Sequence, residues 1–370
     1  MVKNNYNKGE WSELYSFIKL LKEGKIYTAD ENANRIVSQY LPIIKLIRNE
    51  EVGIEREFYT GDEIKIFENG ELIATFNKNN LNHYIDLMLT KLFDKNGHYE
   101  HSGAFPIPEI ETLMKDLHIK KVKASSAEKI DINMQIQDIN TGYSPIVGFS
   151  IKSDIGSPPT LLNAGKNTRI RYRINNISDN QIKEFNSIDK AVVKEYMKAR
   201  IEKLKSYNLK VEFDKILDST FEDNLIMIDS SLPHIYAEMI LQHYLKISDS
   251  IYDCSQIVNI LIDENPLKYR RTDIYKHKFK KLICASALGM TPGKPWDGLD
   301  SATGGYIIIK KDGDVLCYHL YNRNFFEEYL LSNTRFDRPS ATRYDYGYIY
   351  KENNVAYIDL NVQIRFKSIR

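Results

Sequence analysis

The stretch IDINMQIQ at residues 130–137 and the stretch IVGFSIK at residues 146–152 decide the expected fold. In both stretches apolar and polar side chains alternate with the period of two that a half-buried strand shows. The sequence Gly-Tyr-Ser-Pro between them is typical of a tight turn. We therefore predict a β-hairpin in which 130–137 pairs with 146–152.

The chain on either side of this hairpin alternates between helical and strand patterns. Trp11, Leu14 and Ile18 share one face of a helix expected over 8–22, and Gly24 ends it. Further helices are expected at 79–93, 107–118, 179–186, 189–206, 231–247, 254–262, 270–288 and 324–331, with strands at 168–174, in a second hairpin at 305–321, and near 346–350 and 355–366. The protein is therefore predicted to be α+β.

These changes in pattern also divide the chain into regions. Residues 25–78 consist of short apolar stretches separated by charged or glycine-containing turns, which is typical of meandering strands. We expect an N-terminal helix of the core at 1–24, a β-rich insert at 25–78, the core at 79–215, a helical region at 216–300 and a β-rich C-terminal region at 301–370.

Composition limits the classes of protein that fit. Hydrophobic residues make up 42% of the 370 residues and charged residues 27%, as in ordinary folded proteins. The net charge is only +1, so a nucleic-acid surface would have to come from local clusters of basic residues. Three widely spaced cysteines indicate neither a disulfide framework nor a zinc motif. Without an apolar signal core or a run of about 18 apolar residues, we expect a cytoplasmic protein with no membrane segment.

The hairpin carries the sharpest chemical signal. Asp131 lies in its first strand and Lys152 at the end of its second, so both side chains can aim at one point. Phosphodiester hydrolysis needs a divalent cation held by carboxylates and a cationic group near the attacking water. The arrangement resembles the PD-(D/E)XK nucleases, which implies a core of a mixed sheet flanked by helices. Ser150 stands where that motif usually has its second acid.

The serine leaves the expected metal site one carboxylate short. Some restriction enzymes of the PD-(D/E)XK superfamily also read Ser-x-Lys and supply a glutamate from a helix. By this resemblance, Asp131 and Glu13 are the expected metal ligands, and Asp131, Lys152, Glu13 and Ser150 form the expected catalytic group. Glu10 lies in the first turn of the same helix and is an alternative, as is Glu184 farther along the chain.

Longer stretches extend the resemblance over most of the chain. GFSIKSDIGSPPTLLNAGKNTRIRYRI at 148–174, KGEWSELYSFIKLLKEGKIYTAD at 8–30, LPIIKLIRNE at 41–50 and GGYIIIKKDGDVLCYHLYNRNFFEEYL at 304–330 are similar, in this order, to segments of HpaII-type restriction endonucleases. The resemblance implies a homodimeric type II enzyme that uses Mg²⁺ and cuts double-stranded DNA at a short palindrome. CCGG is the target for which the family is known.

Several polar residues are candidates for DNA contacts. Arginines that alternate along 168–174 would line one face of a strand and suit phosphate contacts. Arginine is also the commonest reader of guanine, and the insert at 25–78 supplies candidates for that role. The expected DNA-binding residues are Lys166, Arg169, Arg171, Arg173, Asn163, Thr160, Arg35, Arg48 and Arg56. Basic clusters at 268–281 and 335–343 are alternatives.

Two other functions remain open. One is a different PD-(D/E)XK nuclease, such as a resolvase or a nicking repair enzyme. The other is a DNA-binding protein without catalysis, because Ser150 interrupts the usual motif. The absence of a Walker A loop, a GxGxxG motif and a GxSxG motif in a suitable setting argues against helicases, dehydrogenases and serine hydrolases.

Overall fold

The predicted hairpin is present in the computed structural model, where β6 (Ile132–Ile136) pairs antiparallel with β7 (Ile146–Ser153). The structure describes residues 5–51, 53–92, 103–123, 130–139, 141–155, 158–189, 191, 193–245 and 251–367. The chain divides into two compact units. Unit 1 comprises Met1–Pro159, Asp300–Tyr329 and Ser368–Arg370, and unit 2 comprises Thr160–Leu299 and Leu330–Lys367.

A nine-stranded sheet organises unit 1 around the hairpin, in the order β1-β13-β12-β7-β6-β2-β3-β4-β5. The other strands are β1 (Lys25–Ala29), β2 (Arg35–Glu51), β3 (Ile54–Tyr59), β4 (Glu63–Glu68), β5 (Glu71–Asn77), β12 (Gly305–Ile309) and β13 (Val315–His319). β1 pairs parallel with β13, β12 pairs parallel with β7, and the remaining pairs are antiparallel. A mixed sheet is thereby confirmed.

The long strand β2 closes part of this sheet into a ring. Residues 35–42 pair with β1, and residues farther along β2 pair with β6 and β3. The pairings therefore run β1–β13–β12–β7–β6–β2 and return to β1. This closure was not expected from the sequence, because alternation shows that residues 35–51 form strand but not that two parts of one strand pair with different neighbours.

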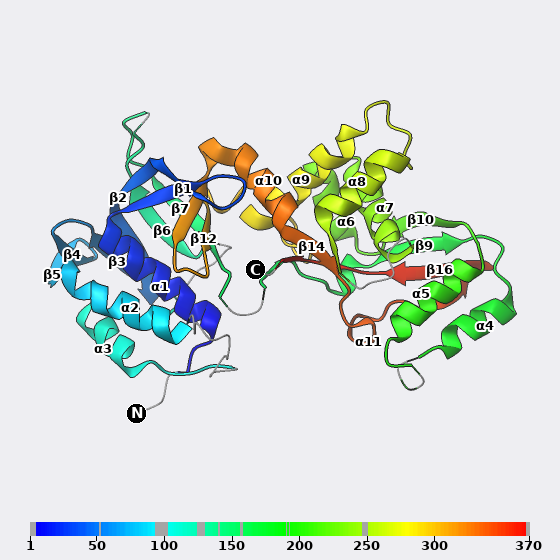
Figure 1. Ribbon diagram of the computed structural model, residues 1–370, viewed down its shortest axis with the longest axis horizontal. Helices are drawn as coiled ribbons and strands as arrows, with labels where there is room; N and C mark the ends of the chain where they lie inside the picture. The colour runs from blue at the N-terminus through cyan, green and yellow to red at the C-terminus, as the bar shows by residue number, and fades with distance from the viewer. Residues whose placement is uncertain are drawn as a thin grey trace. The chain divides into compact units, whose positions relative to one another are not determined.

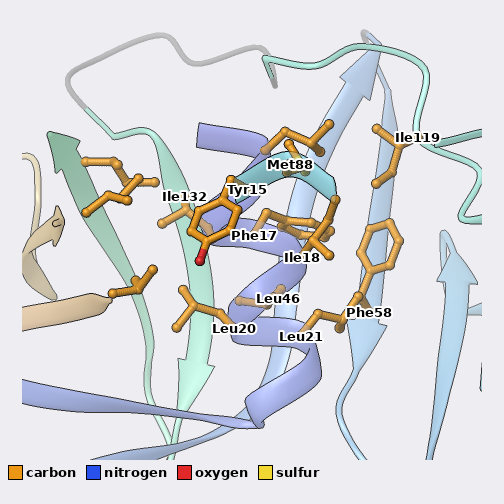
Figure 2. Packing of buried hydrophobic residues seen from close by; sticks show 14 of the residues in the cluster. Tyr15, Phe17, Ile18, Leu20, Leu21, Leu46, Phe58, Met88, Ile119 and Ile132 are labelled. Atoms are coloured by element: carbon orange, nitrogen blue, oxygen red, sulfur yellow. The ribbon is translucent and has the colours of Figure 1, made fainter. Parts of the chain in front are cut away.

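Helix α1 (Lys8–Glu23) supplies the apolar face that covers the sheet. Asn7 caps its N-terminus, and Gly24 ends it in the left-handed conformation with φ 64°, as predicted. Its residues Tyr15 and Ile18 pack with Leu46 of β2 and Ile132 of β6 in one buried cluster (Figure 2). The other helical segments of unit 1 are η1 (Lys78–Asn80), α2 (Leu81–Leu92), α3 (Pro108–Asp116) and η3 (Leu320–Asn322); α10 (Arg323–Asn333) begins in unit 1 and ends in unit 2.

Unit 2 contains two four-stranded sheets, β10-β9-β16-β15 and β11-β14-β17-β8. The strands are β8 (Thr160–Leu162), β9 (Ile170–Ile174), β10 (Val211–Ile216), β11 (Ile251–Asp253), β14 (Thr334–Asp337), β15 (Ile349–Glu352), β16 (Val355–Leu360) and β17 (Gln363–Phe366). The helices are η2 (Lys166–Thr168), α4 (Asp179–Ser187), α5 (Tyr196–Ser206), α6 (Ser219–Ile228), α7 (Leu232–Leu245), α8 (Cys254–Glu264), α9 (Asp273–Leu288) and α11 (Ala341–Tyr344) (Figure 1).

The two units cut across the regions drawn from sequence patterns. Residues 25–78 do not pair only among themselves, since β1 joins β13 and β2 joins β6. The expected core at 79–215 contributes to both units, because the hairpin belongs to unit 1 and β9 pairs with β10 and β16 in unit 2. No helix in the described part of the chain is long and apolar enough to cross a membrane.

Candidate active site

Asp131 lies directly before β6 and is held by the neighbouring strand β7. Its Oδ2 accepts a hydrogen bond of 2.8 Å from the Ile151 amide and one of 3.4 Å from the Ser150 hydroxyl. Ser150 is buried. Ser150 thus donates to Oδ2 of Asp131, and Oδ1 faces another group.

That other group is the ammonium of Lys123, which also contacts Glu13 on α1. Lys123 Nζ lies 3.7 Å from Asp131 Oδ1 and 3.1 Å from Glu13 Oε1. Burial and the Asp131 carboxylate raise the pKa of Glu13 above its usual range, against the opposing effect of Lys123 and Lys152. The carboxylates of Glu13 on α1 and of Asp131 directly before β6 therefore converge on the same ammonium group.

Lys152 belongs to the same polar group. It follows Ser150 by two positions on β7, so both side chains lie on one face of the strand. Its charge acts on Glu13 and favours the ionised carboxylate. The structure thus brings together Asp131, Glu13 and Ser150, which the sequence analysis had chosen from positions far apart in the chain, and the charge of Lys152 acts on Glu13.

Sequence reasoning missed Lys123, although a signal for it exists. It ends the lysine-rich run Lys120-Lys121-Val122-Lys123, eight positions before Asp131. Burial acts to lower the pKa of Lys123, but the Glu13 and Asp131 carboxylates outweigh it and raise the pKa above its usual value. Only the tertiary structure shows that this lysine, among several, reaches the carboxylates.

Arg48 and Arg56, which the sequence analysis proposed as readers of DNA bases, are both buried and bonded within the protein. Arg48 pairs with the buried Glu50 at 2.8 Å and donates to the Lys121 carbonyl at 2.6 Å. Glu50 in turn accepts a hydrogen bond of 2.9 Å from the Lys120 amide. These contacts hold the segment that carries Lys123, so Arg48 supports the candidate site from inside the protein.

Arg56 makes a similar set of internal contacts one strand away. Its guanidinium donates to Glu68 at 2.6 and 2.8 Å and to the His118 carbonyl. Arg35 differs, because it is partly exposed and pairs with Asp314 at 3.2 Å while lying over the ring of Tyr27. Of the three arginines proposed from the insert, only Arg35 has a side chain that solvent reaches.

The two alternative glutamates have other partners. Glu10 accepts a hydrogen bond of 2.8 Å from the Asn7 amide and so completes the capping box of α1. Glu184 lies on α4 in unit 2, where it pairs with Lys203 and accepts a hydrogen bond from Tyr207. Glu13 is therefore the glutamate that the structure places beside Asp131.

The alternating arginines of β9 lie in unit 2 and face carboxylates. Arg171 pairs with Asp214 at 2.7 Å and with Glu352 at 2.8 Å. Arg169, directly before the strand, lies within 3.5 Å of Asp345 and 3.8 Å of Asp359. Arg173 is the most exposed of the three, and its contact with Glu212 is 3.9 Å long. Their alternation is present as predicted, but much of their charge is already neutralised.

The polar loop before β9 is held as a defined turn. Thr168 Oγ1 accepts a hydrogen bond of 2.8 Å from the Gly165 amide, and the buried Asn361 binds both Thr168 and the Gly165 carbonyl. The candidate residues Asn163 and Lys166 are exposed on this loop, while Thr160 is partly buried in β8. A loop supported in this way can present polar side chains to a partner.

The donors at the candidate site fit a magnesium ion. Carboxylate oxygens are the hard ligands that Mg²⁺ prefers, and proteins usually bind it through one or two carboxylates, with waters and substrate phosphates completing the shell. Glu13 and Asp131 supply two such groups around one cationic position. Within the ranges that the structure describes, no group of three or more histidine, cysteine, aspartate or glutamate side chains could hold a metal.

Comparison with known proteins gives consistent matches over nearly the whole chain. The sequence model described as HpaII restriction endonuclease matches residues 7–366. The chain is 39% identical over 370 residues to the type II restriction enzyme HpaII of Haemophilus parainfluenzae, covering 97% of this chain and 98% of that protein. No solved structure matches.

Proposed function

Because this chain belongs to the HpaII restriction endonuclease family, we propose that it hydrolyses double-stranded DNA at the palindrome CCGG, as a homodimer with Mg²⁺. The observation that carries the proposal is the convergence of Glu13 and Asp131, with Lys152 beside them. Carboxylates and a lysine at one point are what metal-dependent phosphodiester hydrolysis requires. The hairpin is accordingly proposed as the centre of a PD-(D/E)XK nuclease core.

Each residue of the site has a definite task in this proposal. Glu13 and Asp131 hold Mg²⁺, which when bound polarises the scissile phosphate and lowers the pKa of water. The Ile151 amide and the Ser150 hydroxyl fix the direction of the Asp131 carboxylate. Lys152 orients the attacking water and stabilises the negative charge that develops on the phosphate.

Recognition of DNA is assigned to elements outside the hairpin. Contacts to phosphates position a protein, whereas contacts to base edges specify sequence. We assign phosphate contacts to Lys166, Arg169 and Arg173, and base contacts to the loop at 153–168 with Thr160 and Asn163. Arg35 remains the candidate reader from residues 25–78, since solvent reaches its side chain.

A homodimer follows from the symmetry of the target. A palindrome has a two-fold axis, so two identical subunits can each cut one strand. Sedimentation of the protein on a duplex with one site should give two chains per duplex. A single chain per site would contradict the dimer and leave the cleavage chemistry unaffected.

The direct test is digestion of a DNA of known sequence in Mg²⁺, followed by sequencing of the fragment ends. Discrete fragments whose ends share CCGG would support the whole proposal. Ends that share another tetranucleotide would contradict the target but not the nuclease. Nicks without sequence preference would favour a resolvase or repair nuclease, and binding without cleavage would favour an inactive DNA-binding protein.

A further inference from the structure

The ammonium of Lys123 lies where the proposed metal ion would have to bind. It contacts Glu13 Oε1 at 3.1 Å and Asp131 Oδ1 at 3.7 Å, the two carboxylates assigned above as metal ligands. We propose that Lys123 occupies the cation position of the metal-free enzyme and leaves it when a divalent ion binds. This inference rests on the proposed function and assigns a role to a residue outside the Asp131…Lys152 motif.

The metal-free site needs a cation because its two acids repel each other. Both carboxylates lie within 3.7 Å of the Lys123 ammonium, so their negative charges are close together. Their low exposure, 20% for Glu13 and 12% for Asp131, strengthens the repulsion. Lys123 opposes this repulsion by ion pairing and by a hydrogen bond to Glu13. The ammonium of Lys123 thereby keeps the two carboxylates close together in the metal-free protein.

A divalent ion and the ammonium cannot share this position. A metal held by Glu13 and Asp131 would add positive charge beside the ammonium that now contacts both carboxylates, and like charges at such separations repel strongly in a partly buried site. The ammonium therefore competes with the metal. Its departure thus accompanies metal binding.

The structure makes Lys123 easy to displace. The preceding residues are held by Arg48 and Glu50, which bond to the backbone of Lys120 and Lys121. The Lys123 side chain, by contrast, is 46% exposed, against 20% for Glu13 and 12% for Asp131. A flexible four-carbon stem on an anchored backbone can swing its charge into solvent while the ligands stay in place.

The test measures metal binding without DNA and without turnover. Free Mn²⁺ is followed by electron paramagnetic resonance at pH 8 for the wild type and for Lys123→Met, which keeps the length of the side chain and removes its charge. We expect Mn²⁺ to bind about tenfold more tightly to the variant, because a competing charge is gone. Lys123→Gln should behave in the same way. Weaker or unchanged binding by both variants would overturn the inference.

Thermal unfolding provides a second readout and a matched control. In EDTA, Lys123→Met should melt at a lower temperature than the wild type, and saturating Mn²⁺ should remove the difference. Lys120→Met is the control, because Lys120 is about as exposed but pairs with Glu51 at 3.1 Å and not with Glu13 or Asp131. A Lys120 variant that matched Lys123→Met in Mn²⁺ affinity would contradict a specific role for Lys123.

One further variant separates this inference from the function on which it rests. Asp131→Ala should lose Mn²⁺ binding if Asp131 is a metal ligand. Undiminished binding by Asp131→Ala would remove the proposed metal site itself. Loss of binding by Asp131→Ala, with no gain in Lys123→Met, would keep the metal site and refute only the displacement of Lys123.

Discussion

The site in unit 1 and strand β9 in unit 2 both contain a cation with two carboxylate partners, but the two cations differ in exposure: Lys123 is 46% exposed and Arg171 is 12% exposed. In unit 1, two carboxylates share the ammonium of one half-exposed lysine, Lys123. In unit 2, the guanidinium of Arg171 pairs with two carboxylates, those of Asp214 and Glu352, and also lies over the ring of Tyr357. The exposed lysine is a cation that a ligand can displace, whereas the less exposed arginine joins β9 to β10 and β15 within the protein.

The difference shows why a row of arginines in a sequence is a weak sign of a DNA surface. Arg171 is 12% exposed, and despite burial its pKa is raised because of Asp214 and neighbouring groups. A phosphate would have to displace two carboxylates to reach it. Arg173, at 48% exposed, is free of that competition except for a contact of 3.9 Å with Glu212. A binding site is therefore distinguished by charged side chains whose present partners a ligand can displace, and not by the number of its charged side chains.

The largest effect is expected from the unit 1 site. Asp131→Ala and Lys152→Ala should each lower the rate of DNA cleavage by about 10³-fold or more, because each removes a group that acts on the reacting phosphate. Single-turnover cleavage of a duplex with one site measures this. Asp62→Ala and Lys65→Ala on the exposed surface of unit 1 are the controls and should cut normally. Near-normal cleavage by either site variant would move catalysis elsewhere.

Replacing Arg48 tests whether this residue stabilises the fold around the candidate site or contacts a DNA base. Arg48→Met would leave the buried carboxylate of Glu50 without its charged partner, which costs about 3–5 kcal/mol in comparable buried pairs. Urea unfolding should show this loss of stability. If Arg48 instead reads a base, the variant would unfold like the wild type and accept altered target sequences.

The pH dependence of unfolding tests the packing of β9 against α7. Tyr172 of β9 donates to the Ala237 carbonyl of α7, and the same helix carries His243, whose pKa is lowered to about 3 by burial and by Arg338. In the unfolded chain His243 binds a proton near pH 6.5, whereas in the folded chain it does so only near pH 3. The free energy of unfolding therefore falls as the pH drops from about 6.5 toward 3. Between pH 7 and 5 the loss should be about 2 kcal/mol.

The control for that test is a variant without the titrating group. In His243→Leu, this part of the pH dependence of urea unfolding should disappear, whatever the stability of the variant at pH 7. Equal pH dependence in the two proteins would mean that His243 is protonated in the folded state or exposed to solvent.

Glu13 and Glu10 provide a comparison within one helix. Glu13→Gln should raise the Mg²⁺ concentration for half-maximal cleavage about tenfold, because one of two charged ligands is lost. Glu10→Gln is the matched variant, since glutamine also completes a capping box and keeps α1 intact. A Mg²⁺ titration shifted by the Glu10 change alone would make Glu10 the ligand.

The smallest effect is expected on β9. Arg173→Ala should weaken binding to all DNA sequences alike and lower the salt slope of binding by about 1, as loss of one phosphate contact does. Arg171→Ala should reduce stability by about 1 kcal/mol and change the salt slope less, because its carboxylate partners are within the protein. A larger salt effect from Arg171 would show that DNA displaces those partners.

Much of the local structure could be read from the sequence. The helix ending at Gly24, both hairpins and most helices lie within a few residues of their expected bounds. These features depend on neighbours along the chain, such as alternation, caps and turn residues. The choice of Asp131, Lys152, Ser150 and Glu13 also came from the sequence, through a motif and a family resemblance, and the structure places Asp131, Ser150 and Glu13 close together.

Other properties depend on which parts of the chain meet. The sequence by itself determined the hairpin, α1 and the acidic and basic residues that could act in catalysis. Only the tertiary structure decided that Lys123 bridges Glu13 and Asp131, and that Arg48 and Arg56 are buried and pair with Glu50 and Glu68. The physical reason is that an ionic side chain acquires its role from partners distant in the chain, and a local pattern contains no information on those partners.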